Sequence, residues 1–195
     1  EIAYNILNTY RGGRSNHNDH ISLDQIKFTI KYYRAVLIRR DMGRNGFVSN
    51  GVEQDLSCLE LEKIDASKCC NLSSDCSVYR TKKKLPKFVR LNFNDALTYA
   101  GDITGINSYQ IVEPYMVKWL PNDTYTASKK KVYVIDNYLY LYNAQGENNI
   151  NIRGIFEDPE ELNKFKGCDD NICYDGDSEF PLPMDMVQTI TQGIL

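Results

Sequence analysis

Apolar and polar positions recur with helical spacing over Ser22–Arg44, and this stretch predicts one long helix. Ser22 and Gln25 have the spacing of a capping box, in which each side chain accepts a hydrogen bond from the other residue's backbone N–H. Gly43 is the predicted stop, because glycine readily takes the left-handed conformation that ends many helices. The rest of the chain is interpreted around this helix.

The predicted helix carries two apolar stripes on roughly opposite sides. The first stripe consists of Leu23, Ile26, Ile30, Tyr33 and Leu37. The second consists of Phe28, Tyr32, Ala35 and Val36, and the gap between the two is filled by Lys27, Lys31 and Arg34. A helix at the surface of a domain needs only one stripe, so two stripes predict packing from two sides. The helix is either central within one domain or shared with a neighbouring subunit.

Residues 87–155 alternate short β-type runs with Gly, Asn and Pro positions, a pattern typical of a β-rich region. The predicted strands are Phe88–Phe93, Leu97–Tyr99, Ser108–Val112, Tyr115–Leu120, Val132–Ile135, Tyr138–Tyr142 and Ile150–Phe156. Before them, the alternation at Gln54–Ile64 indicates an exposed or edge strand.

One hairpin in this region is predicted with its two faces. Asp136 and Asn137 separate two β-type runs, and two turn-forming residues between strands favour a tight turn. On the second strand, Leu139 and Leu141 share the face that is expected to enter the core of the sheet. The opposite face, expected to meet a helix, a partner or water, carries Tyr138, Tyr140 and Tyr142.

Helical patterns also mark both ends of the chain. Asp158-Pro159 predicts the start of a short helix near 159–166, with Asp as the cap and Pro in the first turn. A last helix follows Pro181-Leu182-Pro183, and its predicted apolar side consists of Met184, Val187, Thr191 and Ile194. The predicted fold class is α+β, with terminal helices forming a helical body from residues 1–50 and 181–195. Residues 51–180 form a β-rich insertion that resembles a sandwich or a barrel.

Composition bears on the partners more than on the fold. A net charge of −3 over 195 residues does not favour nucleic-acid binding, and no apolar run approaches the length of about 18 residues that a membrane span needs. The six cysteines show no C-x2-C pair, so free thiols are favoured over disulfides or a metal site. The chain begins without methionine and ends within a helical pattern, from which we expect a segment of a longer or processed protein.

Motifs for catalysis or metal binding are missing from the sequence. The chain contains no G-x-S-x-G, Walker, H-E-x-x-H or G-x-G-x-x-G motif. Both histidines, His17 and His20, fall in a polar loop. The acidic stretch Asp169–Glu179 lacks the ordered ligand series of a calcium loop. We therefore predict no catalytic residue, no metal and no cofactor.

Several stretches, taken as a series, resemble a virion structural protein family of crAss-like bacteriophages. They are LPKFVRLNFNDALTYAGDITG, KKKVYVIDNYLYLYN, INIRGIFEDPEEL and PLPMDMVQTITQGIL. The opening stretch ILNTYRGGRSNHNDHISLDQIKFTIKYYRAVLIRRD resembles the N-terminal helices of the same family. The resemblance spans nearly the whole chain, although each motif alone is weak.

The resemblance implies a ring-forming component of the phage neck, or head-to-tail connector. Such rings stack beneath the portal and lead into the tail, and twelve-fold symmetry is expected by analogy with podovirus adaptors. The implied partners are other copies of the chain, the portal protein, and other neck or tail ring proteins. Double-stranded DNA would pass through the lumen without sequence-specific contact, and no membrane is involved. Assembly would take place in the host bacterial cytoplasm.

The function hypothesis is therefore a structural connector without enzymatic activity. We expect Phe28, Tyr32 and Val36 to pack against a neighbouring subunit. A second contact, through one face of the β-rich region, is expected at Tyr138, Tyr140 and Tyr142. The main alternative is a monomeric β-rich module that binds carbohydrate or peptide, and a hydrolase of unknown type is a third.

Overall fold

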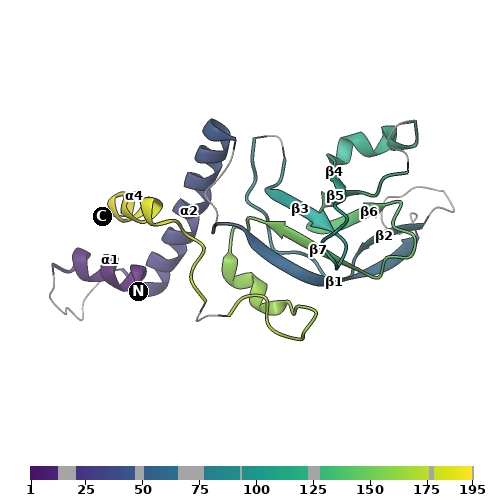
Figure 1. Ribbon diagram of the computed structural model, residues 1–195. Helices are drawn as coiled ribbons and strands as arrows, with labels where there is room; N and C mark the ends of the chain where they lie inside the picture. Colours follow the sequence, from purple (N-terminus) through teal and green to yellow (C-terminus); the bar gives the residue numbers. More distant parts are fainter. Residues whose placement is uncertain are drawn as a thin grey trace.

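The computed structural model describes residues 1–12, 21–46, 51–65, 77–92, 94–122, 128–175 and 178–194. Helices from both ends of the chain lie together, and a β-sheet built from the middle of the chain lies beside them (Figure 1). Both termini are at the helical end of the molecule (Figure 1). The α+β fold class with packed terminal helices is confirmed.

Three helices make up the helical end: α1 (Ile2–Tyr10), α2 (Leu23–Asn45) and α4 (Met184–Ile194). Their core contains Ala3, Ile6, Leu7, Ile26, Ile30, Leu37, Ile38, Met186 and Ile190, joined by Val52, Val89, Ala96 and Ile155 from the β-rich region. These last four residues anchor the sheet to the helices, while the division into a helical body and an insertion stays a prediction.

The buried side of α4 is not the predicted one. Met186 and Ile190 are buried against the other helices, whereas Met184 is 84% exposed. Positions four apart do line one face, as expected for a helix. The prediction was wrong at Met184, which is the first residue of the helix and lies outside the contact with the helical core, whereas the predicted Ile194 packs partly buried against that core.

Seven strands form one nearly closed, barrel-like sheet. They are β1 (Gln54–Asp65), β2 (Ser77–Thr81), β3 (Leu97–Gly101), β4 (Gln110–Ile111), β5 (Lys131–Ile135), β6 (Tyr138–Tyr142) and β7 (Asn149–Gly154). Their order is β3-β7-β1-β2-β6-β5-β4, and only the β4–β5 pair among them is parallel. The two outer strands meet at the Gly101–Ser108 bridge, where the Tyr109 N–H donates to the Ala100 carbonyl over 2.7 Å.

Strand β1 lies in the middle of the sheet, so the edge-strand prediction for Gln54–Ile64 was wrong. It pairs with β7 on one side and with β2 on the other. Its alternation of apolar and polar residues arises because one side of the strand faces the barrel core, with Leu56 and Leu59 buried there. Periodicity shows which side of a strand is covered, but it cannot show how many neighbours the strand has.

The predicted hairpin between β5 and β6 is confirmed. Asp136 and Asn137 both have positive φ, 51° and 64°, which is the signature of the turn that suits a two-residue hairpin. Leu139 and Leu141 enter the barrel core as expected.

Three other predictions for this region need correction. Tyr115–Leu120 is not a strand but part of the 3-10 helix η1 (Pro114–Asn122), which begins at a proline whose fixed φ suits a helix start. The predicted strand Phe88–Phe93 is not formed over its described part, residues 88–92, which contribute only isolated bridges at Phe88 and Arg90. Strand β2, which joins β1 to β6, was not predicted.

The short helix after the sheet starts at the predicted residue. It is a 3-10 helix, η2 (Pro159–Lys164), and the Asp158 side chain accepts a hydrogen bond from the Glu160 N–H over 3.0 Å. Leu162 and Phe165 are buried in the barrel core. Helix η2 thus closes the barrel on the side that faces α2 (Figure 1).

Candidate functional site

Helix α2 has a hydrogen-bonded cap at each end. The Gln25 N–H donates to Ser22 Oγ over 3.2 Å, and the Ser22 N–H donates to Gln25 Oε1 over 2.8 Å, which confirms the capping box. The helix ends at Gly46, which has φ 75° and donates its N–H to the Met42 carbonyl over 3.0 Å. Gly43, the predicted stop, lies inside the helix, because the left-handed residue comes three positions later.

The inner face of α2 carries the first predicted stripe and one buried cation. Ile26, Ile30 and Leu37 are buried against α1 and α4. Arg34 is fully buried among them, although the sequence placed it with two lysines in a polar gap. A buried guanidinium is stable only if its donors are satisfied.

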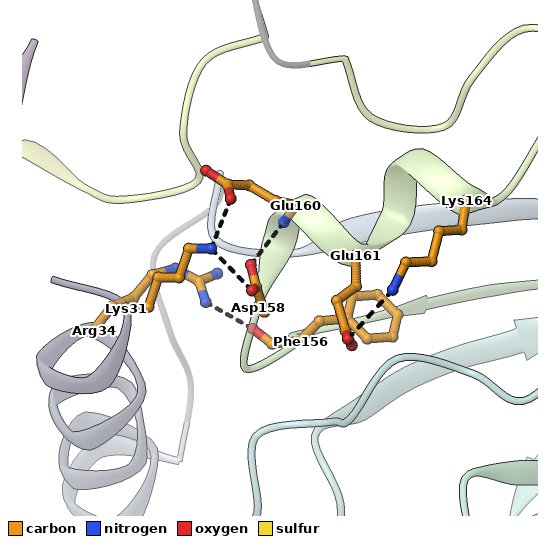
Figure 2. A network of polar contacts seen from close by, with 7 residues as sticks. All are labelled: Lys31, Arg34, Phe156, Asp158, Glu160, Glu161 and Lys164. Carbon is orange, nitrogen blue, oxygen red and sulfur yellow. Dashed lines mark hydrogen bonds and ion pairs between the residues drawn. The ribbon is translucent and has the colours of Figure 1, made fainter. Parts of the chain in front are cut away.

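Arg34 binds three backbone carbonyls that come from distant parts of the chain. Nε donates to Pro181 over 2.7 Å, Nη1 to Phe156 over 2.7 Å, and Nη2 to Val52 over 3.2 Å. The contact with Phe156 is visible in Figure 2. Burial lowers the pKa of Arg34 to about 10, so the side chain is still protonated at neutral pH. Arg34 therefore joins α2 to the start of β1, the end of β7 and the segment before α4.

Lys31 attaches the flank of α2 to the cap of η2. Its Nζ lies 2.9 Å from Asp158 Oδ2 and 2.6 Å from Glu160 Oε2 (Figure 2). Partial burial alone would lower the pKa of Lys31, but the hydrogen bonds to Glu160 and Asp158 outweigh it and raise that pKa. With Lys31 and Arg34 held, the rotation of α2 about its axis relative to the sheet is fixed.

The side of α2 turned away from these contacts is apolar and open. Phe28, Tyr32 and Val36 are 72%, 60% and 43% exposed, and we call them the outer face of α2. They are four residues apart, so they form one continuous strip along the helix. None of them belongs to a hydrophobic core formed by the described residues. Of the second predicted stripe, only Ala35 packs against the helical core, and the other three residues have no core partner among the described residues.

The three tyrosines of β6 lie together, but they are largely covered by their own chain. Tyr140 is 6% exposed and its ring stacks on Tyr133, with 5.4 Å between the centroids. Both rings lie in a small core with residues of η1, and burial raises the pKa of Tyr133 to about 12. Tyr138 and Tyr142 flank this core and are half-buried. The predicted tyrosine face therefore meets a helix, and it does not lie near the outer face of α2 (Figure 1).

Helix η1 displays a set of apolar residues that the sequence analysis missed. Tyr115, Met116 and Trp119 are 71%, 43% and 62% exposed on its outer side. The nitrogen of Lys118 lies 5.1 Å from the centroid of the Trp119 ring. Large exposed aromatic residues are typical of protein interfaces. The single tryptophan beside a tyrosine was the available signal, but the stretch was interpreted as a strand.

The free-thiol prediction for the cysteines was wrong for one pair. Cys58 and Cys168 form a disulfide across 110 residues, with 5.1 Å between their Cα atoms. Cys58 lies in a β1 bulge with φ 55°, and its N–H donates to Asn151 Oδ1 over 2.8 Å. Cys173 is a free thiol whose pKa is raised by burial. The remaining cysteines, Cys69, Cys70 and Cys76, lie outside the described residues.

The described residues contain no cluster of histidine, cysteine or carboxylate side chains that could hold a metal ion. His17 and His20 lie outside the described residues, and so does part of the acidic stretch Asp169–Glu179. Among the helices that the structure describes, none combines the length and apolar character needed to cross a bilayer.

Comparison with protein families relates the whole chain to a known group. Residues 1–195 match the family model described as phage tail ring protein 2, a ring protein family of crAss-like phages. None of the curated proteins compared with the chain matches it. The match confirms the family resemblance seen in the sequence.

Proposed function

The chain belongs to the phage tail ring protein 2 family, and from this membership we propose that it is one subunit of a closed ring in the neck of a crAss-like phage. Membership of a tail ring family implies a structural, non-catalytic protein that assembles with its own copies in the virion tail. We further propose that the ring joins the portal to the tail, lines the DNA channel and has twelve subunits.

The observation that carries the proposed self-assembly is the open outer face of α2. From Phe28 to Val36 the helix rises by eight residue steps, or about 12 Å at 1.5 Å per residue. An exposed apolar strip of this kind on a well-anchored helix is typical of a protein interface. Since Arg34 and Lys31 hold the helix in place, the strip is already in position to bind a neighbour.

A ring contact differs from the contact in a symmetric dimer. Head-to-tail packing joins two unlike surfaces of the same chain, and a ring closes when the rotation between neighbours divides the circle. The outer face of α2 supplies one of the two surfaces. The exposed side of η1, with Tyr115, Met116 and Trp119, lies at the far end of the sheet from α2 (Figure 1). We propose that η1, with Tyr138 and Tyr142 beside it, contacts an adjacent ring of the stack.

The proposed DNA channel requires that the lumen does not grip DNA. A net charge of −3 supports this, because non-specific DNA binding depends on clustered positive charge. DNA would then slide through the ring without sequence-specific contact. The ring would act mechanically, by holding its neighbours and keeping the channel open.

Native mass spectrometry of the full chain, with and without the portal protein, tests the proposal. We expect a closed oligomer whose mass is a multiple of 22.5 kDa. Cryo-electron microscopy of phage particles should then show this ring between the portal and the tail. A chain that remains monomeric in both samples, and that is absent from the neck density, would support the alternative of a monomeric carbohydrate- or peptide-binding module.

A further inference from the structure

A short hairpin after η2 is built as a rigid projection. In residues 165–175, which we call the acidic hairpin, the Gly167 N–H donates to the Asn171 carbonyl over 2.7 Å. The Cys173 N–H donates to the Phe165 carbonyl over 3.0 Å, and Lys166 and Ile172 form a bridge. The disulfide between Cys168 and Cys58 attaches the hairpin to β1. The backbone of the hairpin is therefore held in a fixed arrangement.

The surface of the acidic hairpin combines one apolar residue with several carboxylates. Ile172 is 54% exposed, a large fraction for an isoleucine in a constrained hairpin. Asp169, Asp170 and Asp175 are also exposed. The basic residue of the hairpin, Lys166, lies 3.7 Å from Asp170 and offsets one of these charges. The hairpin itself thus carries an exposed apolar residue and a net negative charge, while Lys82 and Lys83 line the pocket beside Asp170.

The outer face of α2 has the complementary character. Beyond Val36 the helix continues with Arg39 and Arg40, both exposed. Arg40 lies 3.6 Å from Asp41, whereas Arg39 forms no ion pair with any residue that the structure describes. A strip of aromatic residues followed by two arginines matches an isoleucine surrounded by aspartates, both in apolar contact and in charge.

The two surfaces do not meet within one chain. Lys31 holds the flank of α2 against Asp158 and Glu160 of the η2 region, from which the acidic hairpin continues. The outer face is turned away from this contact, and Phe28 remains 72% exposed. A hairpin that covers the outer face must therefore come from another molecule.

We infer that, in the ring, the acidic hairpin of one subunit docks on the outer face of α2 in the next, with Ile172 against Phe28 and Tyr32. This inference rests on the proposed self-assembly and names the second of the two unlike surfaces. The aspartates of the hairpin pair with Arg39 and Arg40 at the rim. Every subunit then offers one hairpin and one helix face, as ring closure requires.

Charge reversal on each surface tests this pairing. The helix variant carries Arg39→Glu and Arg40→Glu, and the hairpin variant carries Asp169→Lys and Asp170→Lys. Each variant alone should need about a hundredfold higher concentration to assemble, because like charges then face each other. A control with the same charge change as the helix variant, at exposed positions outside both surfaces, is Lys63→Glu with Lys129→Glu, and it should assemble like the wild type. Circular dichroism checks that all variants fold.

Recovery of assembly when the two charge reversals are combined would show that the two surfaces contact each other. A chain with all four substitutions should assemble again, and so should an equal mixture of the helix and hairpin variants, since alternating subunits place opposite charges at every contact. Failure of both to assemble, or normal assembly of either variant alone, overturns the inference and leaves the proposed ring intact. A wild-type chain that never assembles contradicts the proposed function itself. Sedimentation velocity measures all of these outcomes.

Discussion

Each of the two faces of helix α2 carries an exception to the usual distribution of polar and apolar residues. The inner face contains a fully buried arginine, whereas the outer face exposes a phenylalanine and a tyrosine. Arg34 can be buried because each of its donating nitrogens meets a backbone carbonyl. No hydrophobic core formed by the described residues includes Phe28. The comparison supports the proposal that α2 belongs to two interfaces, one formed within the single chain and one with a neighbouring subunit.

Burial of the outer face of α2 would contribute a favourable free energy to assembly. Complete burial of an aromatic side chain stabilises by about 1.5–3 kcal/mol. Phe28 and Tyr32 retain most of that contribution while they remain exposed. Assembly can draw on it without rearranging the fold, because the inner face holds α2 in position. The following substitutions test this division between the faces.

The largest effect is expected at Arg34. Arg34→Met keeps an unbranched side chain but removes all three hydrogen bonds, which leaves the carbonyls of Val52, Phe156 and Pro181 without this donor. We expect the free energy of unfolding to fall by about 4 kcal/mol. Urea denaturation followed by circular dichroism measures it.

Arg34→Lys is the matched control for the geometry of this contact. It keeps the charge but cannot reach three carbonyls with one ammonium group as the planar guanidinium does, so the loss should be intermediate. If the free energy of unfolding of Arg34→Met lies within about 1 kcal/mol of the wild-type value, the stability of the inner face does not depend on the three hydrogen bonds of Arg34.

On the outer face, a double substitution should separate assembly from folding. Phe28→Ser with Tyr32→Ser should weaken assembly by about a hundredfold, or about 3 kcal/mol, because aromatic residues dominate interface energies. The melting temperature of the monomer should barely change, since both side chains are mostly exposed.

Ile103→Ser with Ile106→Ser is the control for lost apolar surface, because these residues are exposed on the loop after β3. This variant should assemble normally. If both double variants assemble like the wild type, the outer face is not a subunit contact.

Local signals in the sequence were enough to place much of the fold. The capping box of α2, the β5–β6 hairpin and the Asp158 start of η2 each depend on a few neighbouring residues. The two stripes of α2 were also recognised, because helical periodicity is a local property.

Long-range contacts explain what the sequence did not reveal. Arg34 is buried only because three carbonyls from distant segments converge on it, and Cys58 meets Cys168 only because the segment after η2 folds back against β1. The central position of β1 depends on strands β7 and β2, whose pairing no local pattern specifies. The residues of the outer face were predicted from the sequence, but their exposure became clear only from the structure.

A smaller effect is expected at Lys31, which ties the flank of α2 to η2. Since its folded pKa is raised above the ordinary 10.5, the ion pairs stabilise the fold below that pH. Their contribution is lost as the pH rises through the folded pKa. Lys31→Met should cost about 0.5–1 kcal/mol at pH 7, because both carboxylates are partly exposed.

Melting curves at neutral pH and above pH 10.5 test the sign of this effect. The difference between wild type and Lys31→Met should shrink at the higher pH. Lys27→Met, at an exposed position without an ion pair to the described residues, should melt like the wild type throughout. A difference that grows with pH would show that the ion pairs are not the cause.

Effects of about the same size as that of Lys31→Met are expected at the C-terminal end of α2, where two glycines three residues apart should respond in opposite directions. Gly46→Ala forces a side chain into φ 75° and should destabilise by about 1 kcal/mol. Gly43→Ala lies within the helix, where its Cβ would meet only Asn92 Nδ2 at 3.5 Å, and should stabilise by about 0.5–1 kcal/mol. Thermal melts of the two variants give the signs directly. The reverse signs would place the end of α2 at Gly43 and would shorten the helix on which Arg39 and Arg40 are carried.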